Sequence, residues 1–178
     1  ALDEIKKYGA PTPVHYMQSL VEGERIAKLC GGETELVKIG VCLMDIKLGQ
    51  CMHEGVPTEH VKRSAEYAKK ILEENHVDKK TKELLLNCVE AHHGKVPFKS
   101  LEAEICANAD CYRFTHPQGV FDFILNAAKR KGVDQNKAIE MVLAKLEEKH
   151  NILSLDCCKA ELEPHYQTIK KFLEESRI

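Results

Sequence analysis

The sequence lacks the features of a membrane-spanning, secreted or strongly charged protein. Among its 178 residues, no apolar run approaches the ~18 residues that a membrane-spanning helix needs. The N-terminal stretch ALDEIKK contains no apolar segment of the kind found in signal peptides. Lysine and arginine number 26 against 28 aspartates and glutamates, and the net charge of −2 argues against nucleic acids or membrane surfaces as partners. We therefore expect a cytoplasmic protein with neither kind of partner.

Cysteine is abundant, but the spacings that give cysteine a structural role are absent. None of the eight cysteines belongs to a Cys-x-x-Cys pair, so the sequence predicts neither a zinc finger nor a thioredoxin-like site. No secretion signal supports a disulfide framework. The adjacent Cys157 and Cys158 are either a redox-active pair or chance neighbours in a loop. Four cysteines fall within apolar helical patterns, and we expect them to be reduced thiols in the core: Cys30, Cys42, Cys88 and Cys106.

Sustained alternation of apolar and polar residues, which marks a half-buried strand, is also missing. With 43% apolar and 30% charged residues, the composition is that of an ordinary globular protein. Proline, glycine and capping residues divide the chain into about eight amphipathic segments, so we predict a single all-α domain over residues 1–178. The expected helices cover residues 14–30, 34–48, 58–75, 78–93, 100–114, 117–128, 134–150 and 157–175.

Two of these segments bear on the architecture. Residues 34–48 are apolar on both sides, which is typical of a buried central helix, and residues 49–57 are predicted to form a loop. Residues 116–178 are expected to form a helical extension that closes over the first five helices.

Three polar residues take core-facing places on three of the expected helices. Asp45 lies in the middle of the nearly all-apolar segment VCLMDIK, while His92 and Asp110 each occupy the last place of an apolar stripe. Burying a carboxylate is costly unless it is paired or binds a metal ion. A lone histidine of this kind can be a hydrogen-bonded core residue, and a lone aspartate can cap a helix or pair with an arginine such as Arg113. Several convergent carboxylates and imidazoles also suit Mn²⁺, Fe²⁺, Ni²⁺, Zn²⁺ or Mg²⁺.

The order of these and neighbouring residues forms a longer pattern. Its elements are His15, LMDI at 43–46, EHV at 59–61 with Ser64 and Ala65, EAHH at 90–93, SLEA at 100–103 and AD at 109–110. Each motif is short, but their order and spacing together resemble the HD-domain superfamily of metal-dependent phosphohydrolases. The resemblance covers residues 12–115 as the core, and the helical tail is similar to that of small stand-alone members.

The resemblance implies a divalent metal ion as cofactor and a ligand set for it. His15, Asp45 and Asp110 match metal ligands, and in binuclear members the aspartate of the signature pair bridges two metals. The family has histidine, itself a ligand, where this chain has Met44. A neutral thioether is a poor ligand for Mn²⁺, Mg²⁺ or Fe²⁺, so three of four ligands would remain. By proximity in sequence, His53 is either a replacement ligand or a solvated surface histidine.

The resemblance also implies groups that act on substrate. His60 and His92 look like the histidines that face a second metal or the substrate phosphate, with His93 as a substitute for His92. Lys47 is similar to a basic residue that often follows the signature pair and can touch phosphate. Glu54 is a weaker candidate for a general base.

Two main functions follow from these matches. The first is a metal-dependent phosphohydrolase acting on a nucleotide or other small phosphate ester, in which a metal ion activates water for attack on phosphorus. The alternative is a degenerate HD-domain protein that binds a nucleotide or anion without efficient catalysis, in a sensing or interaction role. A purely structural helical module is the third interpretation, and it predicts no metal at all.

Overall fold

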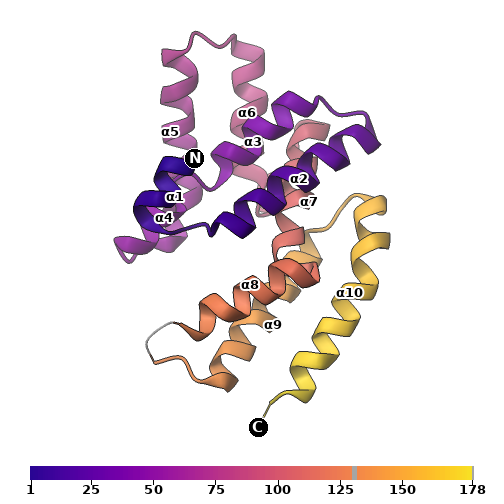
Figure 1. Cartoon of the computed structure of the whole chain (residues 1–178). Helices are drawn as coiled ribbons and strands as arrows, with labels where there is room; N and C mark the ends of the chain where they lie inside the picture. The colour runs from indigo at the N-terminus through magenta and orange to yellow at the C-terminus, as the bar shows by residue number, and fades with distance from the viewer. Residues whose placement is uncertain (130–131, 178) are drawn as a thin grey trace.

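The computed structural model describes residues 1–129 and 132–177, and within these ranges every regular element is a helix (Figure 1). The predicted all-α class is therefore confirmed. The elements are α1 (Leu2–Tyr8), α2 (Pro13–Cys30), α3 (Thr34–Met44), α4 (Leu48–His53), the 3-10 helix η1 (Pro57–Glu59), α5 (His60–Glu74), α6 (Lys79–Ala91), α7 (Leu101–Thr115), α8 (Pro117–Ala128), α9 (Gln135–Ile152) and α10 (Asp156–Glu175).

Capping residues set several helix boundaries where the sequence predicts them. The side chains of Asp78, Ser100 and Asp134 each accept a hydrogen bond from the backbone N–H three residues on, at 3.1, 3.2 and 2.8 Å. Each bond satisfies one of the donors that a helix N-terminus leaves free. Gly31 ends α2 in the left-handed conformation, with φ of 80°.

The chain turns sharply where one continuous helix over 34–48 was expected. Helix α3 ends at Met44, a turn covers residues 45–47, and α4 begins at Leu48. The prediction of a loop over 49–57 was therefore wrong in its first half. The apolar pattern gave no sign of this turn, because the end of α3 and the start of α4 both contain buried residues.

Contacts distant in sequence stabilise this turn. The backbone N–H of Lys47 donates a 3.1 Å hydrogen bond to Ser64 Oγ on α5. Helix α4 packs against the N-terminal segment at Gly49, where a Cβ would collide with the carbonyl oxygen of Ala10. The turn thus places Asp45 at the C-terminal end of α3, where its side chain is buried.

Helix α7 is the central helix of the fold. Every residue from Ile105 to Thr115 is buried, and α7 packs against α2, α3, α6, α8, α9 and α10. Helix α3, which the sequence indicated as central, leaves Ile39 41% exposed. Alanine and cysteine supply five of the fifteen residues of α7, and such small side chains let neighbouring helices approach closely while giving only a weak hydrophobic pattern.

The helices after α7 pack on its C-terminal half. In Figure 1, α8 and α9 lie in the lower part of the molecule, α10 runs down its right-hand side, and α7 connects these helices to α1–α6. Val120, Leu146 and Tyr166 belong to a core cluster shared by α8, α9 and α10. Helix α10 also reaches the main core through Cys158 and Leu162.

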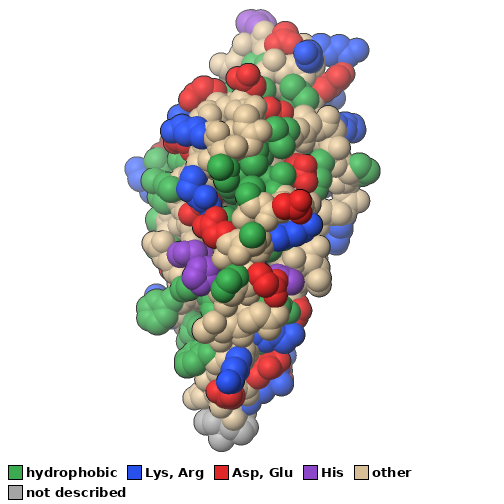
Figure 2. Space-filling view, turned by 90° about the vertical axis from the view of Figure 1, so that its right-hand side faces the viewer, with side chains coloured by type: hydrophobic (Ala, Val, Ile, Leu, Met, Phe, Trp, Pro, Cys, Tyr) green, Lys and Arg blue, Asp and Glu red, His purple; other side chains and the backbone are tan. Residues whose placement is uncertain are grey.

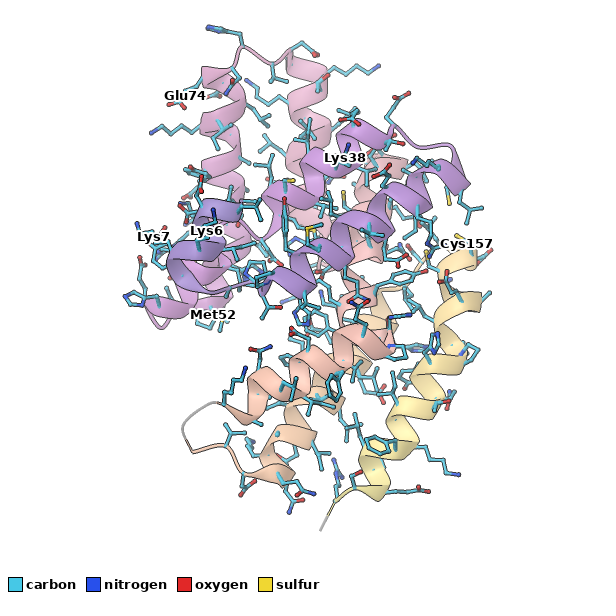
Figure 3. All side chains as sticks on the ribbon, viewed as in Figure 1. Lys6, Lys7, Lys38, Met52, Glu74 and Cys157 are labelled. Atoms are coloured by element: carbon cyan, nitrogen blue, oxygen red, sulfur yellow. The ribbon has the colours of Figure 1, made fainter. Side chains whose placement is uncertain are left out.

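The face shown in Figure 2 interleaves basic and acidic side chains. No helix in the described ranges has the length and apolar character needed to cross a membrane. All eight cysteines are free thiols. Cys157, labelled in Figure 3 at the start of α10, has its Sγ 3.7 Å from the Sγ of Cys30 at the end of α2 and 3.9 Å from that of Cys158.

Candidate functional site

A cavity of about 540 Å³ lies where the N-terminal helices meet α7, α8 and α9. Its lining combines ionisable side chains with apolar ones, including Met52 of α4, which Figure 3 labels. The other large apolar lining residues are Leu48, Phe114, Phe123 and Met141. The charged lining residues are Asp45, Asp110, Arg113, Lys145, Glu148 and Lys149. Such a mixed lining suits a ligand with a charged group and an apolar part.

Asp45 is at the centre of the ionisable groups. Its Oδ2 forms an ion pair with Arg113, whereas Oδ1 is buried and accepts no hydrogen bond. That free oxygen lies 3.4 Å from His60 Nε2 and 3.6 Å from His92 Nε2. Burial disfavours the charged form of Asp45, but the Arg113 guanidinium outweighs it and holds the pKa of the carboxyl well below its usual range. Asp45 is therefore an ionised carboxylate with one oxygen available.

Backbone carbonyls orient the two histidines that face this oxygen. His60 Nδ1 lies 2.7 Å from Pro57 O, and His92 Nδ1 lies 2.7 Å from Val89 O. A carbonyl only accepts, so each Nδ1 carries the proton, and in the neutral ring each Nε2 presents a lone pair. Burial lowers the pKa of His60, which favours that neutral ring. Two imidazole lone pairs and a carboxylate oxygen thus point at one another without a proton between them.

His93 completes the group from the turn after α6. Its Nε2 lies 3.0 Å from His60 Nε2, and its Nδ1 lies 3.1 Å from Lys149 Nζ and 3.4 Å from Glu148 Oε1. Burial, together with His92 and Lys149, lowers the pKa of His93 to about 2, so the ring is neutral at pH 7. Because a donor and an acceptor both face Nδ1, either tautomer of His93 finds a partner.

These atoms fit a divalent metal ion. The ligand nitrogens of His60, His92 and His93 all lie within 4.8 Å of one another. Four ligands arranged tetrahedrally at ~2.1 Å from an ion lie ~3.4 Å apart, close to the separations around Asp45 Oδ1. The unpartnered Asp45 Oδ1 and His92 Nε2 are the groups that such an ion would satisfy. The carbonyl contacts at Nδ1 are those that commonly orient metal-binding imidazoles.

Asp110 is close to Asp45 but is fully engaged by cations. Its Oδ1 accepts from Arg113 at 2.6 Å and its Oδ2 from Lys149 at 2.5 Å. Burial raises the pKa of Asp110, but Lys149 and Arg113 together bring it below its usual value. The two aspartates, Arg113 and Lys149 are nearly inaccessible to solvent, with exposures of 1% for Asp110 and Lys149, 4% for Arg113 and 7% for Asp45. The two negative and two positive charges cancel.

His15 lines the same cavity but is turned toward α8. Its Nε2 lies 3.1 Å from Gly119 O and 3.4 Å from Asp122 Oδ2. Gly119 permits this approach of α8, because a Cβ there would lie 2.6 Å from the carbonyl carbon of Arg113. Burial and the nearby Arg113 lower the pKa of His15 to about 4. The ligand set His15, Asp45 and Asp110 stays a prediction, with Arg113 between its two carboxylates.

Two residues next to Asp45 in sequence point elsewhere. Met44 is 1% exposed and lies in the main apolar core. Lys47 places its Nζ 3.3 Å from Glu4 Oε2 and 3.9 Å from the centre of the Tyr67 ring, and it does not line the cavity. The structure therefore does not bring Lys47 together with His60 and His92, its predicted partners in catalysis.

The two candidates on α4 and after it are also outside the cavity. The ring of His53 contacts Tyr8, with centroids 5.9 Å apart. Glu54 pairs with Arg63 and accepts a 2.8 Å hydrogen bond from Gln50. Neither side chain lines the cavity, and both are exposed.

Sequence reasoning missed the contribution of α9. Lys149 and Glu148 look like surface charges near the end of an amphipathic helix, and no local signal distinguishes them from the other charged residues there. Arg113 was one of the alternatives, as a salt-bridge partner for an inward aspartate. The structure shows that it pairs with both Asp45 and Asp110.

Comparison with known proteins supports the fold. No family model matches the sequence, and no curated protein does. A crystal structure described as a predicted HD superfamily hydrolase, from an uncultured Thermotogales bacterium, aligns with a TM-score of 0.63. The alignment covers 97% of this chain and 84% of that chain at 18% identity. The chain therefore has the HD-domain fold, as the resemblance implied.

Proposed function

We propose that this protein is a metal-dependent phosphohydrolase that acts on a small phosphate ester, with nucleotides as the first class of substrate to test. The divalent ion would be held by Asp45 Oδ1 and the histidines at positions 60, 92 and 93. The fold of a protein described as an HD superfamily hydrolase supports this assignment.

One observation carries the proposal. Asp45 Oδ1 and His92 Nε2 are both buried without a hydrogen-bond partner, and they face each other at 3.6 Å. A buried polar group without a partner has lost its hydrogen bonds to water, which lowers the stability of the folded protein by about 1–3 kcal/mol for each group. A cation between them would remove that cost, and among the described residues neither lysine nor arginine pairs with this oxygen, which only the rings of His60 and His92 approach.

The residues around the cavity have complementary tasks. A divalent ion held here would supply Lewis-acid polarisation of a phosphoryl oxygen and lower the pKa of nearby water. Lys145, whose side chain is 37% exposed, can turn from Glu148 toward a phosphate oxygen. Met52, Phe123 and Met141 provide apolar surface for the organic part of the ester.

The test combines metal analysis with a substrate panel. Protein purified without chelator is analysed for metal, then assayed on nucleotide monoesters and diesters with Mn²⁺, Fe²⁺, Ni²⁺, Zn²⁺ or Mg²⁺. We expect metal-stimulated hydrolysis that falls by ~100-fold or more in His60→Gln, because that variant loses a ligand lone pair. His53→Gln, outside the cavity, is the matched control and keeps full activity. Absence of metal-stimulated hydrolysis on the whole panel would refute the proposal.

The alternative of binding without efficient catalysis has an observation of its own. Position 44 carries a core methionine in place of the histidine of the HD pair, and Arg113 bridges the carboxylates beside it. This function predicts that a nucleotide or phosphate raises the thermal unfolding temperature while no product accumulates. Turnover of the same ligand would exclude it.

A further inference from the structure

The two carboxylates of the site are joined by a single nitrogen atom. Arg113 Nη1 donates to Asp110 Oδ1 at 2.6 Å and also pairs with Asp45 Oδ2. It occupies the space between the two aspartates, where an ion bound to both oxygens would have to lie, because metal–oxygen distances are ~2.0–2.2 Å. A guanidinium nitrogen and a metal ion cannot share that space.

Among the described residues, no histidine is turned toward that position either. Met44 offers a thioether from within the apolar core, and His15 Nε2 is turned to Gly119 O and Asp122. The imidazoles with free lone pairs lie on the other side of Asp45, around its Oδ1. The donors thus define one metal position with protein ligands, around Asp45 Oδ1, and a second position, between the two carboxylates, that Arg113 already fills.

We propose that Arg113 is a built-in replacement for a second divalent ion, and that the centre binds one metal ion, on the histidine side of Asp45. This inference rests on the proposed function, since it assumes the metal site formed by Asp45 and the three histidines. Arg113 reaches back one helical turn to Asp110 on α7, so its guanidinium is fixed by the same helix that presents the carboxylate. A guanidinium does not lose its proton in proteins, so this charge is permanent.

The charges of the centre agree with this replacement. Asp45 and Asp110 are balanced by Arg113 and Lys149, so one bound divalent ion gives the centre a net charge of +2. Two divalent ions beside the same two carboxylates, without the arginine and the lysine, would give the same net charge. A phosphate dianion therefore meets the same net charge in a one-metal centre of this kind.

The test is the number of metal ions per chain. The purified protein is equilibrated with Mn²⁺, freed of excess ion and analysed by elemental analysis and by electron paramagnetic resonance. We expect one ion per chain with the spectrum of an isolated Mn²⁺, because no second ion lies close enough for spin coupling. Two ions per chain, or a spin-coupled pair, would overturn the inference and leave the proposed function standing. No bound ion would overturn the proposed function, and the inference with it.

Variants of Arg113 test the replacement itself. Arg113→Met frees Asp45 Oδ2 and Asp110 Oδ1, and two carboxylate oxygens with water can hold a Mn²⁺ without a neutral protein ligand. We therefore expect a second Mn²⁺ per chain and a larger rise of the unfolding temperature on Mn²⁺ addition than in the unmodified protein. Arg63→Met, which removes a surface arginine paired with Glu54 and Glu59, is the control and keeps one ion. If Arg113→Met folds only with Mn²⁺, the ion count of that folded form still decides: one ion would contradict the replacement.

Discussion

His93 Nδ1 lies 3.4 Å from Glu148 Oε1, across the boundary between the α6–α7 turn and α9. Lys149 Nζ lies 3.1 Å from the same nitrogen, so a donor and an acceptor face one ring atom. When His93 donates from Nδ1 to Glu148, its Nε2 is free to bind a metal ion. When Nδ1 accepts from Lys149, Nε2 carries the proton and points to His60. An acceptor at Nδ1, the place that Glu148 takes, would favour the tautomer of His93 whose Nε2 can act as a ligand.

Removing Glu148 should therefore weaken metal binding without removing a ligand. We expect Glu148→Ala to lower the affinity for Mn²⁺ or Zn²⁺ by ~10–100-fold, the usual effect of losing a group that orients a metal-binding histidine. Glu140→Ala, an exposed position on the same helix that pairs with Lys137, is the control. Isothermal titration of both variants measures the difference. Equal affinities would show that His93 is not a ligand or needs no orienting acceptor.

Restoring histidine at position 44 should not by itself add a metal ion. Met44 is buried in the main core, so Met44→His is expected to lower the free energy of unfolding by about 1–3 kcal/mol, the cost of an unsatisfied buried polar group. With Arg113 still between the carboxylates, the metal content should stay at one ion. Met44→Leu, which keeps the apolar volume, should cost less than ~1.5 kcal/mol. A rise in metal content in Met44→His alone would contradict the role given to Arg113.

The fold class and the inward direction of the site residues could be predicted, because both follow from local periodicity. Asp45, His92 and Asp110 are buried as their positions on apolar stripes indicated. The partners of these residues could not be predicted in the same way. Lys149 is 39 residues from Asp110, and Arg113 is 68 residues from Asp45, so neither contact leaves a local pattern.

The central role of α7 was missed for a related physical reason. Its burial depends on small side chains that allow six neighbouring helices to approach. Hydrophobic periodicity detects large apolar side chains, so it does not reveal a helix that is buried through small ones. The turn at 45–47 was missed because the residues on both sides of it are apolar. The direction of His15 depends on Gly119 and Asp122, which come from α8, more than a hundred residues away in sequence.

The pH dependence of stability should include a contribution from His116. This half-buried ring lies beside His165, with centroids 5.2 Å apart, and burial and His165 lower its pKa. The native state then binds a proton at lower pH than the unfolded chain, whose histidines titrate near 6.5. The free energy of unfolding should therefore fall as the pH drops below about 6.5.

Substitution separates this contribution from the other titrating groups. We expect His116→Asn to flatten the pH dependence of urea unfolding between pH 7.5 and 5.5. His165→Asn should flatten it partly, since it removes one of the two causes of the lowered pKa of His116. An unchanged slope in both variants would contradict the contribution of His116.

The thiols that join α2 and α10 should form a cross-link under oxidation. The Sγ atoms of Cys30 and Cys157 lie 3.7 Å apart, so a small movement would bring them to the ~2.05 Å of a disulfide bond. Hydrogen peroxide would convert the two thiols to one disulfide and be reduced to water. Peptide mapping should find the Cys30–Cys157 bond, with a gain in stability of about 2–4 kcal/mol that Cys157→Ser abolishes. A bond between Cys157 and Cys158 instead would contradict this prediction.

Lys149 belongs to the helices that follow α7, yet it neutralises Asp110 at the centre of the site. A fragment that stops at residue 115 would keep both aspartates and Arg113 but would carry one uncompensated negative charge. Its α7 would also lack the contacts with α8, α9 and α10. The C-terminal third of the chain is therefore not a module that can be deleted or exchanged while the site is kept. Insertions and truncations in α9 should affect the site as directly as substitutions in α3 or α7.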